Sequence, residues 1–241
     1  MRFLLYNIRY GTGRRTRRAW MDMLRRTDNH FESITHFIRE LEPDVVGLVD
    51  TDSGSFRTKN MPQPQRLAEV IGHYHSFGVK YRQHGLLRRT PVFGKQGNAF
   101  LTRDAVQRET FHYFEHGFKR LVIELELQQA NLFLVHLSLR RHVRRRQLDH
   151  LQQLVRTARK PCIVAGDFNV LLGPDELTDF LELAGLQRVN LENRPTYPSW
   201  DPQRVLDFVC YTPTITLRAF ALPQVTLSDH LPLVCDFELP A

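Results

Sequence analysis

Polar side chains end or interrupt apolar stretches at six places along this 241-residue chain, and their types are those that carry acid–base and metal chemistry. They are Asn7, Asp50, His136, Asp167 with Asn169, Asp207, and Asp229 with His230 behind Ser228. A charged group in or beside a buried strand is costly unless it is paired or bound to a metal. One such residue alone is usually a turn residue or a satisfied polar group. Six places together favour a functional site, because layered α/β folds build their sites at strand ends.

The residue types point to the hydrolysis of a phosphate ester. Carboxylate and amide oxygens are hard ligands that suit Mg²⁺ or Mn²⁺. The two histidines are able to hydrogen-bond a phosphoryl oxygen or to move a proton. An acidic site that holds a divalent ion beside imidazoles activates water for attack on phosphorus.

Nine strands must position these residues, since runs of four to eight apolar or alternating residues recur between turn signals. The expected strands are Arg2–Ile8, Val45–Asp50, Asn98–Thr102, Leu121–Leu127, Leu132–Ser138, Cys162–Gly166, Val205–Tyr211, Ile215–Ala219 and Leu233–Phe237. Asn131, between two of them, suggests a tight hairpin.

Helical spacing of apolar residues is weaker and rarer than the strand signal. It predicts helices over 31–41, 148–155 and 177–184, the last ended by Gly185, and a weaker helix over 64–71. Many strands, few helices, and a mixture of hairpins and crossovers favour an α/β sandwich, with packed sheets inside and helices outside. No repeat or linker divides the chain, so we expect one domain over residues 1–241.

In these motifs the chain resembles the endonuclease/exonuclease/phosphatase superfamily, the Mg²⁺-dependent hydrolases related to DNase I. The matching stretches occur in family order and span nearly the whole chain. They are residues 6–8, 43–48, 97–103, 135–137, 166–169 (Gly-Asp-Phe-Asn), 206–209 and 228–233 (beginning Ser-Asp-His). The resemblance implies a four-layer α/β sandwich of two mixed sheets flanked by helices.

The resemblance also implies a role for each polar residue. Asn7, Asp50 and Asp229 would hold the metal, Mg²⁺ or Mn²⁺. His136 would contact the scissile phosphate. Asp167 would orient or deprotonate the attacking water, with Asn169 beside it. Asp207 would orient His230, which would stabilise charge on the phosphoryl group or act as the base, so the base is left open between Asp167 and His230.

One position departs from the family pattern. The family usually has glutamate where this chain has Asp50, and aspartate is one methylene shorter, roughly 1.5 Å of lost reach. Asp52 would face the same way if the strand continued, and would offer a second carboxylate. We interpret the site as functional, with weaker Mg²⁺ binding or a preference for Mn²⁺, against the alternative of a catalytically impaired member that serves as a binding module.

The net charge of +7 comes from two arginine clusters, Arg14–Arg18 and Arg140–Arg146. Such local positive charge is able to attract nucleic acid or an anionic lipid head group to the protein. The alternative is that these arginines only form a solvent-exposed face of a helix. We therefore expect a phosphodiesterase or nuclease. The alternative is an enzyme acting on a phospholipid or small phosphate ester, and its lipid form should expose apolar residues near the site.

The remaining expectations concern the environment of the chain. It has no uninterrupted apolar run long enough to cross a membrane and no recognisable secretory signal. Its three cysteines match no metal or redox motif and are expected to be buried. We expect a cytoplasmic protein, monomeric by default.

Overall fold

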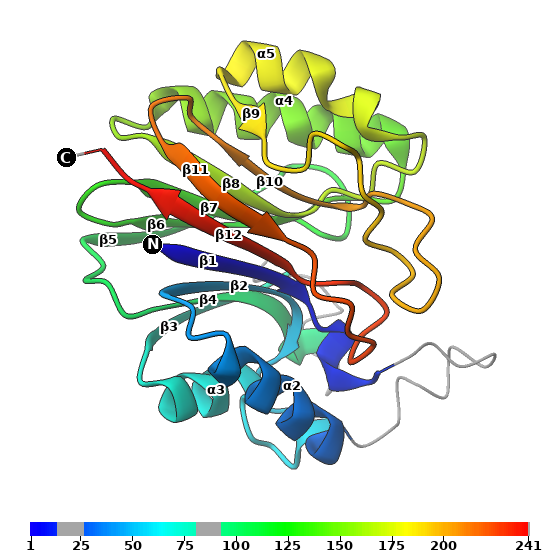
Figure 1. Ribbon diagram of the computed structural model, residues 1–241. Helices are drawn as coiled ribbons and strands as arrows, with labels where there is room; N and C mark the ends of the chain where they lie inside the picture. Colours follow the sequence, from blue (N-terminus) through cyan, green and yellow to red (C-terminus); the bar gives the residue numbers. More distant parts are fainter. Residues whose placement is uncertain (14–26, 81–92, 241) are drawn as a thin grey trace.

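The computed structural model, which describes residues 1–13, 27–80 and 93–240, arranges the strands in two six-stranded sheets (Figure 1). The first sheet has the order β11-β12-β1-β2-β4-β3 and the second the order β5-β6-β7-β8-β10-β9. The strands of the first sheet are β1 (Arg2–Asn7), β2 (Val45–Asp52), β3 (Tyr74–Val79), β4 (Gln96–Thr102), β11 (Thr216–Ala221) and β12 (Leu233–Glu238). Those of the second are β5 (Arg108–Tyr113), β6 (Leu121–Glu126), β7 (Asn131–His136), β8 (Cys162–Asp167), β9 (Gln187–Arg188) and β10 (Asp207–Tyr211).

Helices cover the two outer faces of the sheet pair. Helices α2 (Asp28–Glu40) and α3 (Gln63–Ile71) lie on the first sheet, and α4 (Arg141–Thr157) and α5 (Thr178–Ala184) lie on the second (Figure 1). Short 3₁₀ turns occur at Arg9–Gly11, Phe56–Thr58, Phe93–Lys95 and Pro174–Leu177. The expected four-layer α/β sandwich is confirmed.

Side chains of the central strands point alternately to the two faces of each sheet and form three apolar layers, one between the sheets and one between each sheet and its helices. In β1, Phe3 and Leu5 point into the core between the sheets, whereas Leu4 and Tyr6 pack under α2 and α3. In β7, Leu132 and Leu134 face the first sheet, and Phe133 and Val135 face α4. Strands buried on both faces need apolar residues on both, which is why these runs are nearly continuous in the sequence.

Two parallel strand pairs bring the polar strand ends to one edge of the sandwich. β1 runs parallel to β2, with Asn7 opposite Val49, and β7 runs parallel to β8, with His136 opposite Asp167. Asp207, the first residue of antiparallel β10, lies opposite Asp167 on the other side. Parallel neighbours end at the same edge, so residues far apart in sequence meet there.

The nine expected strands all exist, with ends shifted by a few residues. The sequence missed β3, β5 and β9, because β5 is a half-exposed edge strand without apolar alternation and β9 has only two residues. Val205 and Leu206 precede β10 rather than belonging to it. The hairpin between β6 and β7 is present, but its turn closes from Leu127 to Ala130, and Asn131 begins the next strand.

A register shift in β2 decides where Asp50 points. The pairing with β4 skips between Leu48 and Thr51, and Asp50 adopts a left-handed backbone with φ of 56°. Such a conformation is uncommon outside glycine and marks a bulge. The strand therefore does not continue regularly from Asp50 to Asp52, contrary to the expectation that both carboxylates face the same way.

Candidate active site

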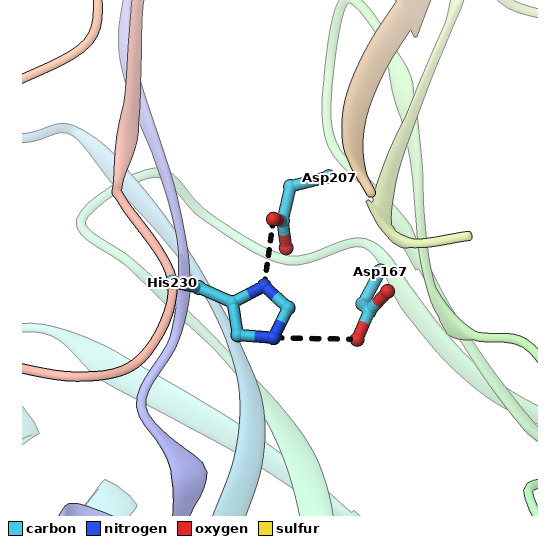
Figure 2. Close-up of side chains that lie close together, drawn as sticks. All are labelled: Asp167, Asp207 and His230. Atoms are coloured by element: carbon cyan, nitrogen blue, oxygen red, sulfur yellow. Dashed lines mark hydrogen bonds and ion pairs between the residues drawn. The ribbon is translucent and has the colours of Figure 1, made fainter. Parts of the chain in front are cut away.

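Three buried side chains form a row at the edge where β8, β10 and the segment before β12 meet (Figure 2). His230 Nδ1 lies 2.7 Å from Asp207 Oδ2, and His230 Nε2 lies 4.0 Å from Asp167 Oδ2. Asp207 is held in turn by the hydroxyl of Thr196, which donates to the same Oδ2 at 2.7 Å. The imidazole is thus fixed through Nδ1, and its Nε2 faces the Asp167 carboxylate across a gap that one oxygen atom is able to bridge.

The charges of this row reinforce one another. Burial by itself disfavours the imidazolium of His230, but the hydrogen bond and charge of Asp207 outweigh burial and raise the pKa of His230 to about 9. Burial likewise would raise the pKa of Asp167, but the hydrogen bond with His136 and the charge of His230 lower it below its usual range. At neutral pH the row therefore contains an ionised Asp167 beside a protonated His230.

Neighbouring amides fix the Asp167 carboxylate. The Asn7 side-chain amide donates to Asp167 Oδ2 at 3.0 Å, and the backbone N–H of Asn169 donates to Asp167 Oδ1 at 3.1 Å. Asn169 has a left-handed backbone, with φ of 54°, and its side chain donates to the carbonyl of Leu137. Asn169 therefore supports the carboxylate by its backbone and ties β8 to the loop after β7 by its side chain.

His136 connects Asp167 to Asp50. Its Nε2 lies 3.2 Å from Asp167 Oδ2, and its Nδ1 lies 3.0 Å from Asp50 Oδ1. The ammonium of Lys119 contacts Nε2 as well. Burial, and then the charges of Lys119 and Lys80, lower the pKa of His136 well below its usual range, so His136 is neutral.

Asp50 is paired with a buried lysine. Lys80 Nζ contacts Asp50 Oδ1, and the Tyr10 hydroxyl donates to the same oxygen at 3.1 Å. Burial and then the charge of Lys119 lower the pKa of Lys80, and the charge of Asp167 acts against them. The direct ion pair with the Asp50 carboxylate keeps the Lys80 side chain an ammonium. Asn98 holds the bulge from β4, since its side-chain oxygen accepts from the Asp50 N–H at 3.2 Å.

Asp229 joins the site through an arginine. Arg9 Nε lies 3.3 Å from Asp229 Oδ2, and the Arg9 backbone N–H donates to Asn7 Oδ1 at 3.1 Å. Arg9 sits in the 3₁₀ turn after β1 with φ of 46°. All residues that the sequence singled out for the site therefore belong to one network of contacts.

As the side chains are arranged, the proposed metal ligands do not form a ready site for a divalent ion, because one oxygen of each is engaged by Arg9 or Lys80. Mg²⁺ needs oxygens at about 2.0–2.1 Å with their lone pairs free. Asn7 Oδ1 accepts from Arg9, Asp229 Oδ2 pairs with Arg9, and Asp50 Oδ1 pairs with Lys80. A different set, Asp167, Asp207 and His230, places one ligand atom each within 4.8 Å of one another, but both nitrogens of His230 already face carboxylates.

Asp52 is not a second carboxylate of the site. It is fully buried and forms an ion pair with Arg57 Nη2 at 2.7 Å. It also accepts from the backbone N–H groups of Gly54 and Ser55. Its role is to close the turn after β2.

Sequence reasoning missed the cations of the site: Arg9, Lys80 and Lys119. Lys80 directly follows β3 and Lys119 shortly precedes β6, so both stand at strand ends like the residues that were found. The signal was present, but a lysine at a strand end normally reaches solvent. Burial lowers the pKa of Lys119 to about 8.

The two arginine clusters fare differently. Arg14–Arg18 lies outside the described residues. In the other cluster Arg144 is buried and structural, since its guanidinium contacts Glu176 and donates to the carbonyl of Ser138 at 2.9 Å. Arg140, Arg141, Arg145 and Arg146 are exposed at the start of α4, which follows the His136 strand.

The remaining structural expectations concern cysteines and membranes. Cys162, Cys210 and Cys235 are buried and free, as expected. Across residues 1–13, 27–80 and 93–240, no helix is both long enough and apolar enough to cross a bilayer.

The fold and the sequence both match known proteins. An endonuclease/exonuclease/phosphatase protein from Beutenbergia cavernae superposes over 99% of this chain and 71% of its own, with a TM-score of 0.77 and 20% identity. The mannosyl-6-phosphatase Bt3783 of Bacteroides thetaiotaomicron superposes over 99% of this chain and 100% of its own, with a TM-score of 0.73 and 14% identity. At these identities the likeness concerns the fold.

In sequence, a UPF0294 protein of Yersinia pseudotuberculosis is 35% identical over 114 residues. The match covers 46% of this chain and 43% of the Yersinia protein, so the chain spans less than half of that relative. The family model described as "Endonuclease/Exonuclease/phosphatase family" matches residues 4–230. Because that match runs from the first strand to the site histidine, this chain belongs to the endonuclease/exonuclease/phosphatase family, whose members hydrolyse phosphate esters and generally use divalent metal ions.

Proposed function

We propose that this protein is a phosphodiesterase, with nucleic acid as its favoured substrate class, and that one domain carries the whole reaction. The observation that carries the proposal is the buried row Asp207–His230–Asp167, in which a protonated imidazole faces an ionised carboxylate. A phosphoryl group needs positive charge on its oxygens and a negative group beside the attacking water, and this row supplies both.

In the proposed step, Asp167 orients the water and accepts its proton as the water oxygen bonds to phosphorus. The ester P–O bond opposite it breaks, and the leaving oxygen takes a proton from solvent. The carboxylate is held by Asn7 and by the Asn169 backbone, so its free lone pairs have a fixed direction. His230 is protonated at neutral pH and is therefore not the base; its Nε2–H stabilises charge on a phosphoryl oxygen. Asp207 holds Nδ1–H and keeps the ring aimed at the substrate.

His136 and Lys119 complete the phosphate site. His136 is neutral and buried between Asp50 and Asp167, and the Lys119 ammonium touches its Nε2. Lys119 is half-buried. When a phosphate enters, Lys119 donates to a non-bridging oxygen, and His136 positions that contact.

The divalent cofactor expected from the family, Mg²⁺ or Mn²⁺ at Asn7, Asp50 and Asp229, stays a prediction. The proposed step does not depend on this ion, because one oxygen of each of these residues is engaged by Arg9 or Lys80. A cytoplasmic location and a monomeric state also remain predictions.

A substrate panel tests the proposal. Supercoiled DNA, abasic DNA, RNA, sphingomyelin, phosphoinositides and a chromogenic bis-ester are incubated with the protein in Mg²⁺, in Mn²⁺ and in EDTA. We expect turnover of a diester and its loss in Asp167→Ala, whereas the remote surface variant Arg218→Gln keeps it. Activity that survives Asp167→Ala, or no turnover of any substrate under the three conditions, contradicts the proposal.

A second candidate, an enzyme for amphiphilic phosphate esters, is favoured by exposed apolar side chains beside the site. Phe118 precedes Lys119 directly, Leu139 follows His136 by three residues, and Leu172 follows Asn169 by three. Their exposed fractions are 68%, 58% and 71%. The variant Leu172→Asp separates the two candidates. If a lipid surface docks here, the variant lowers turnover of vesicle-bound sphingomyelin and leaves turnover of the soluble bis-ester unchanged. Equal turnover of both substrates by the variant and wild type contradicts the second candidate.

A further inference from the structure

Lys80 is a buried cation placed on the carboxylate where the family binds its metal. Its side chain is 2% exposed, and its ammonium contacts Asp50 Oδ1 and lies 3.1 Å from the Tyr10 hydroxyl. The ammonium also lies 5.1 Å from the centre of the Tyr10 ring. Its own backbone N–H is bound to the carbonyl of Gln96, which fixes the residue at the end of β3.

The bulge in β2 aims Asp50 at this lysine. Asp50 has a left-handed backbone and a side chain one methylene shorter than the glutamate of the family pattern. Its Oδ1 receives Lys80 and Tyr10 and lies 3.0 Å from His136 Nδ1. The ammonium and the hydroxyl engage the two lone pairs of Oδ1, so a metal ion reaches that oxygen only in place of one of them.

Charge makes the two cations exclusive. An ammonium removed from water is costly unless it stays paired, so Lys80 does not leave Asp50 without a replacement for its partner. A divalent ion and an ammonium on the same oxygen repel each other strongly in a buried place. The Lys80–Asp50 pair neutralises the carboxylate, which in a metal-dependent site is the task of the ion.

We propose that the Lys80 ammonium is the resident cation of Asp50, and that a divalent ion binds at this carboxylate only by displacing Lys80. The wild-type protein therefore binds divalent ions weakly. Removing the ammonium, and nothing else, uncovers a tighter cation site.

Direct binding of Mn²⁺ tests the proposal without substrate. Mn²⁺ is titrated into wild type, Lys80→Met, Lys80→Arg and the control Lys160→Met, and free Mn²⁺ is followed by electron paramagnetic resonance. Lys160 is a suitable control because it pairs with Glu126 at 2.9 Å on the second sheet. We expect at least tenfold tighter binding in Lys80→Met, no gain in the other two variants, and loss of the gain in Asp50→Asn/Lys80→Met.

Two outcomes overturn the proposal. One is micromolar Mn²⁺ binding by wild type that Lys80→Met leaves unchanged or weakens. The other is a Lys80→Met protein that melts cooperatively and shows no gain. Failure of the proposed phosphodiesterase activity is a separate result, because no substrate is present in this titration.

A measurement on the wild type covers the case in which Lys80→Met does not fold. The side-chain ammonium signal of Lys80 is identified by nuclear magnetic resonance from its absence in Lys80→Arg, and Mg²⁺ is then added. We expect the signal to move or disappear as Mg²⁺ saturates the site. A Lys80 signal that stays unchanged at saturation contradicts displacement.

Discussion

His230 gains its function from what each ring nitrogen faces. Nδ1 is held by Asp207 at 2.7 Å, and Nε2 faces Asp167 at 4.0 Å. Without the Asp207 carboxylate the ring loses both its charge and its direction. A neutral amide at this position keeps the shape of the side chain, but its NH₂ group donates hydrogen bonds, whereas a carboxylate only accepts them.

We therefore expect Asp207→Asn to lower kcat on the best diester by roughly 10²–10⁴-fold. Thr196→Val is the milder variant, because it keeps the Asp207 carboxylate and removes the hydroxyl that donates to it and accepts from the backbone N–H groups of Leu206 and Asp207. We expect it to cost about tenfold. Steady-state kinetics on both variants measure this. Unchanged kcat in Asp207→Asn would show that His230 acts without Asp207.

The Asp52–Arg57 pair serves stability rather than chemistry. Arg57 is 1% exposed and its guanidinium also lies over the Tyr10 ring at 4.9 Å. Arg57→Met leaves the Asp52 carboxylate buried without its ion partner, which costs about 3–5 kcal/mol of unfolding free energy.

Chemical denaturation measures that cost. The double variant Asp52→Asn/Arg57→Met should recover part of the loss, because no buried charge is then left unpaired. A single variant as stable as wild type would mean that water reaches Asp52.

At the scale of elements, a polar contact across three strands of the second sheet gives the fold a pH dependence. Glu124 on β6 lies 2.6 Å from His112 on β5, and its other oxygen accepts from the Asn131 amide of β7 at 2.8 Å. The hydrogen bond from His112 is the main cause that lowers the pKa of Glu124, against burial, which raises it.

A carboxyl whose pKa is lowered by folding stabilises the protein above its unfolded-state pKa, and this stabilisation is lost as the pH falls. We expect wild type to be more stable than Glu124→Gln at pH 6, and the difference to shrink as the pH falls from 4.5 through the lowered pKa of Glu124. Thermal unfolding across this range measures it. Glu182→Gln, on the exposed side of α5, is the control and should show no such change. If the stability difference between wild type and Glu124→Gln grew as the pH fell, it would contradict the conclusion that folding lowers the pKa of Glu124.

Element geometry also separates Asp50 from its expected role. The expectation of a regular strand through Asp52 depended on a two-residue period, and the bulge between Leu48 and Thr51 breaks that period. The bulge turns Asp50 towards Lys80, the residue after β3, and Asp52 pairs instead with Arg57. A change of one backbone conformation thus places two acids that are two residues apart in two different ion pairs.

At the scale of the whole molecule, exposed arginines are the test of a nucleic-acid partner. Arg141, Arg145 and Arg146 are exposed on α4, whereas Arg144 is buried against Glu176. Only the exposed arginines are available to neutralise phosphates. The buried Arg144 instead stabilises the fold through its ion pair with Glu176.

We expect the triple variant Arg141→Gln/Arg145→Gln/Arg146→Gln to bind DNA more weakly and with a lower salt dependence. The slope of log affinity against log salt should fall by about 0.9 for each phosphate contact removed. Fluorescence anisotropy between about 50 and 200 mM salt measures it. An unchanged slope would mean that these arginines form a solvated helix face.

The sequence alone determined the sandwich and the list of polar residues at its strand ends. Strands such as β1 and β7 are buried on both faces, so they needed continuous apolar runs, and Asn7 and His136 stood out at their ends. The edge strand β5 left no such pattern, because one half-exposed face tolerates any residue.

Only the tertiary structure decided the partners of those residues. Lys80 and Lys119 meet Asp50 and His136 across strands that are distant in sequence, and no local period encodes that meeting. A lysine stem is long enough to reach solvent or a buried carboxylate from the same backbone position. The sheet order and the β2 bulge determine that these lysines contact buried site residues instead of solvent. The charge balance of the site is therefore a property of the folded chain.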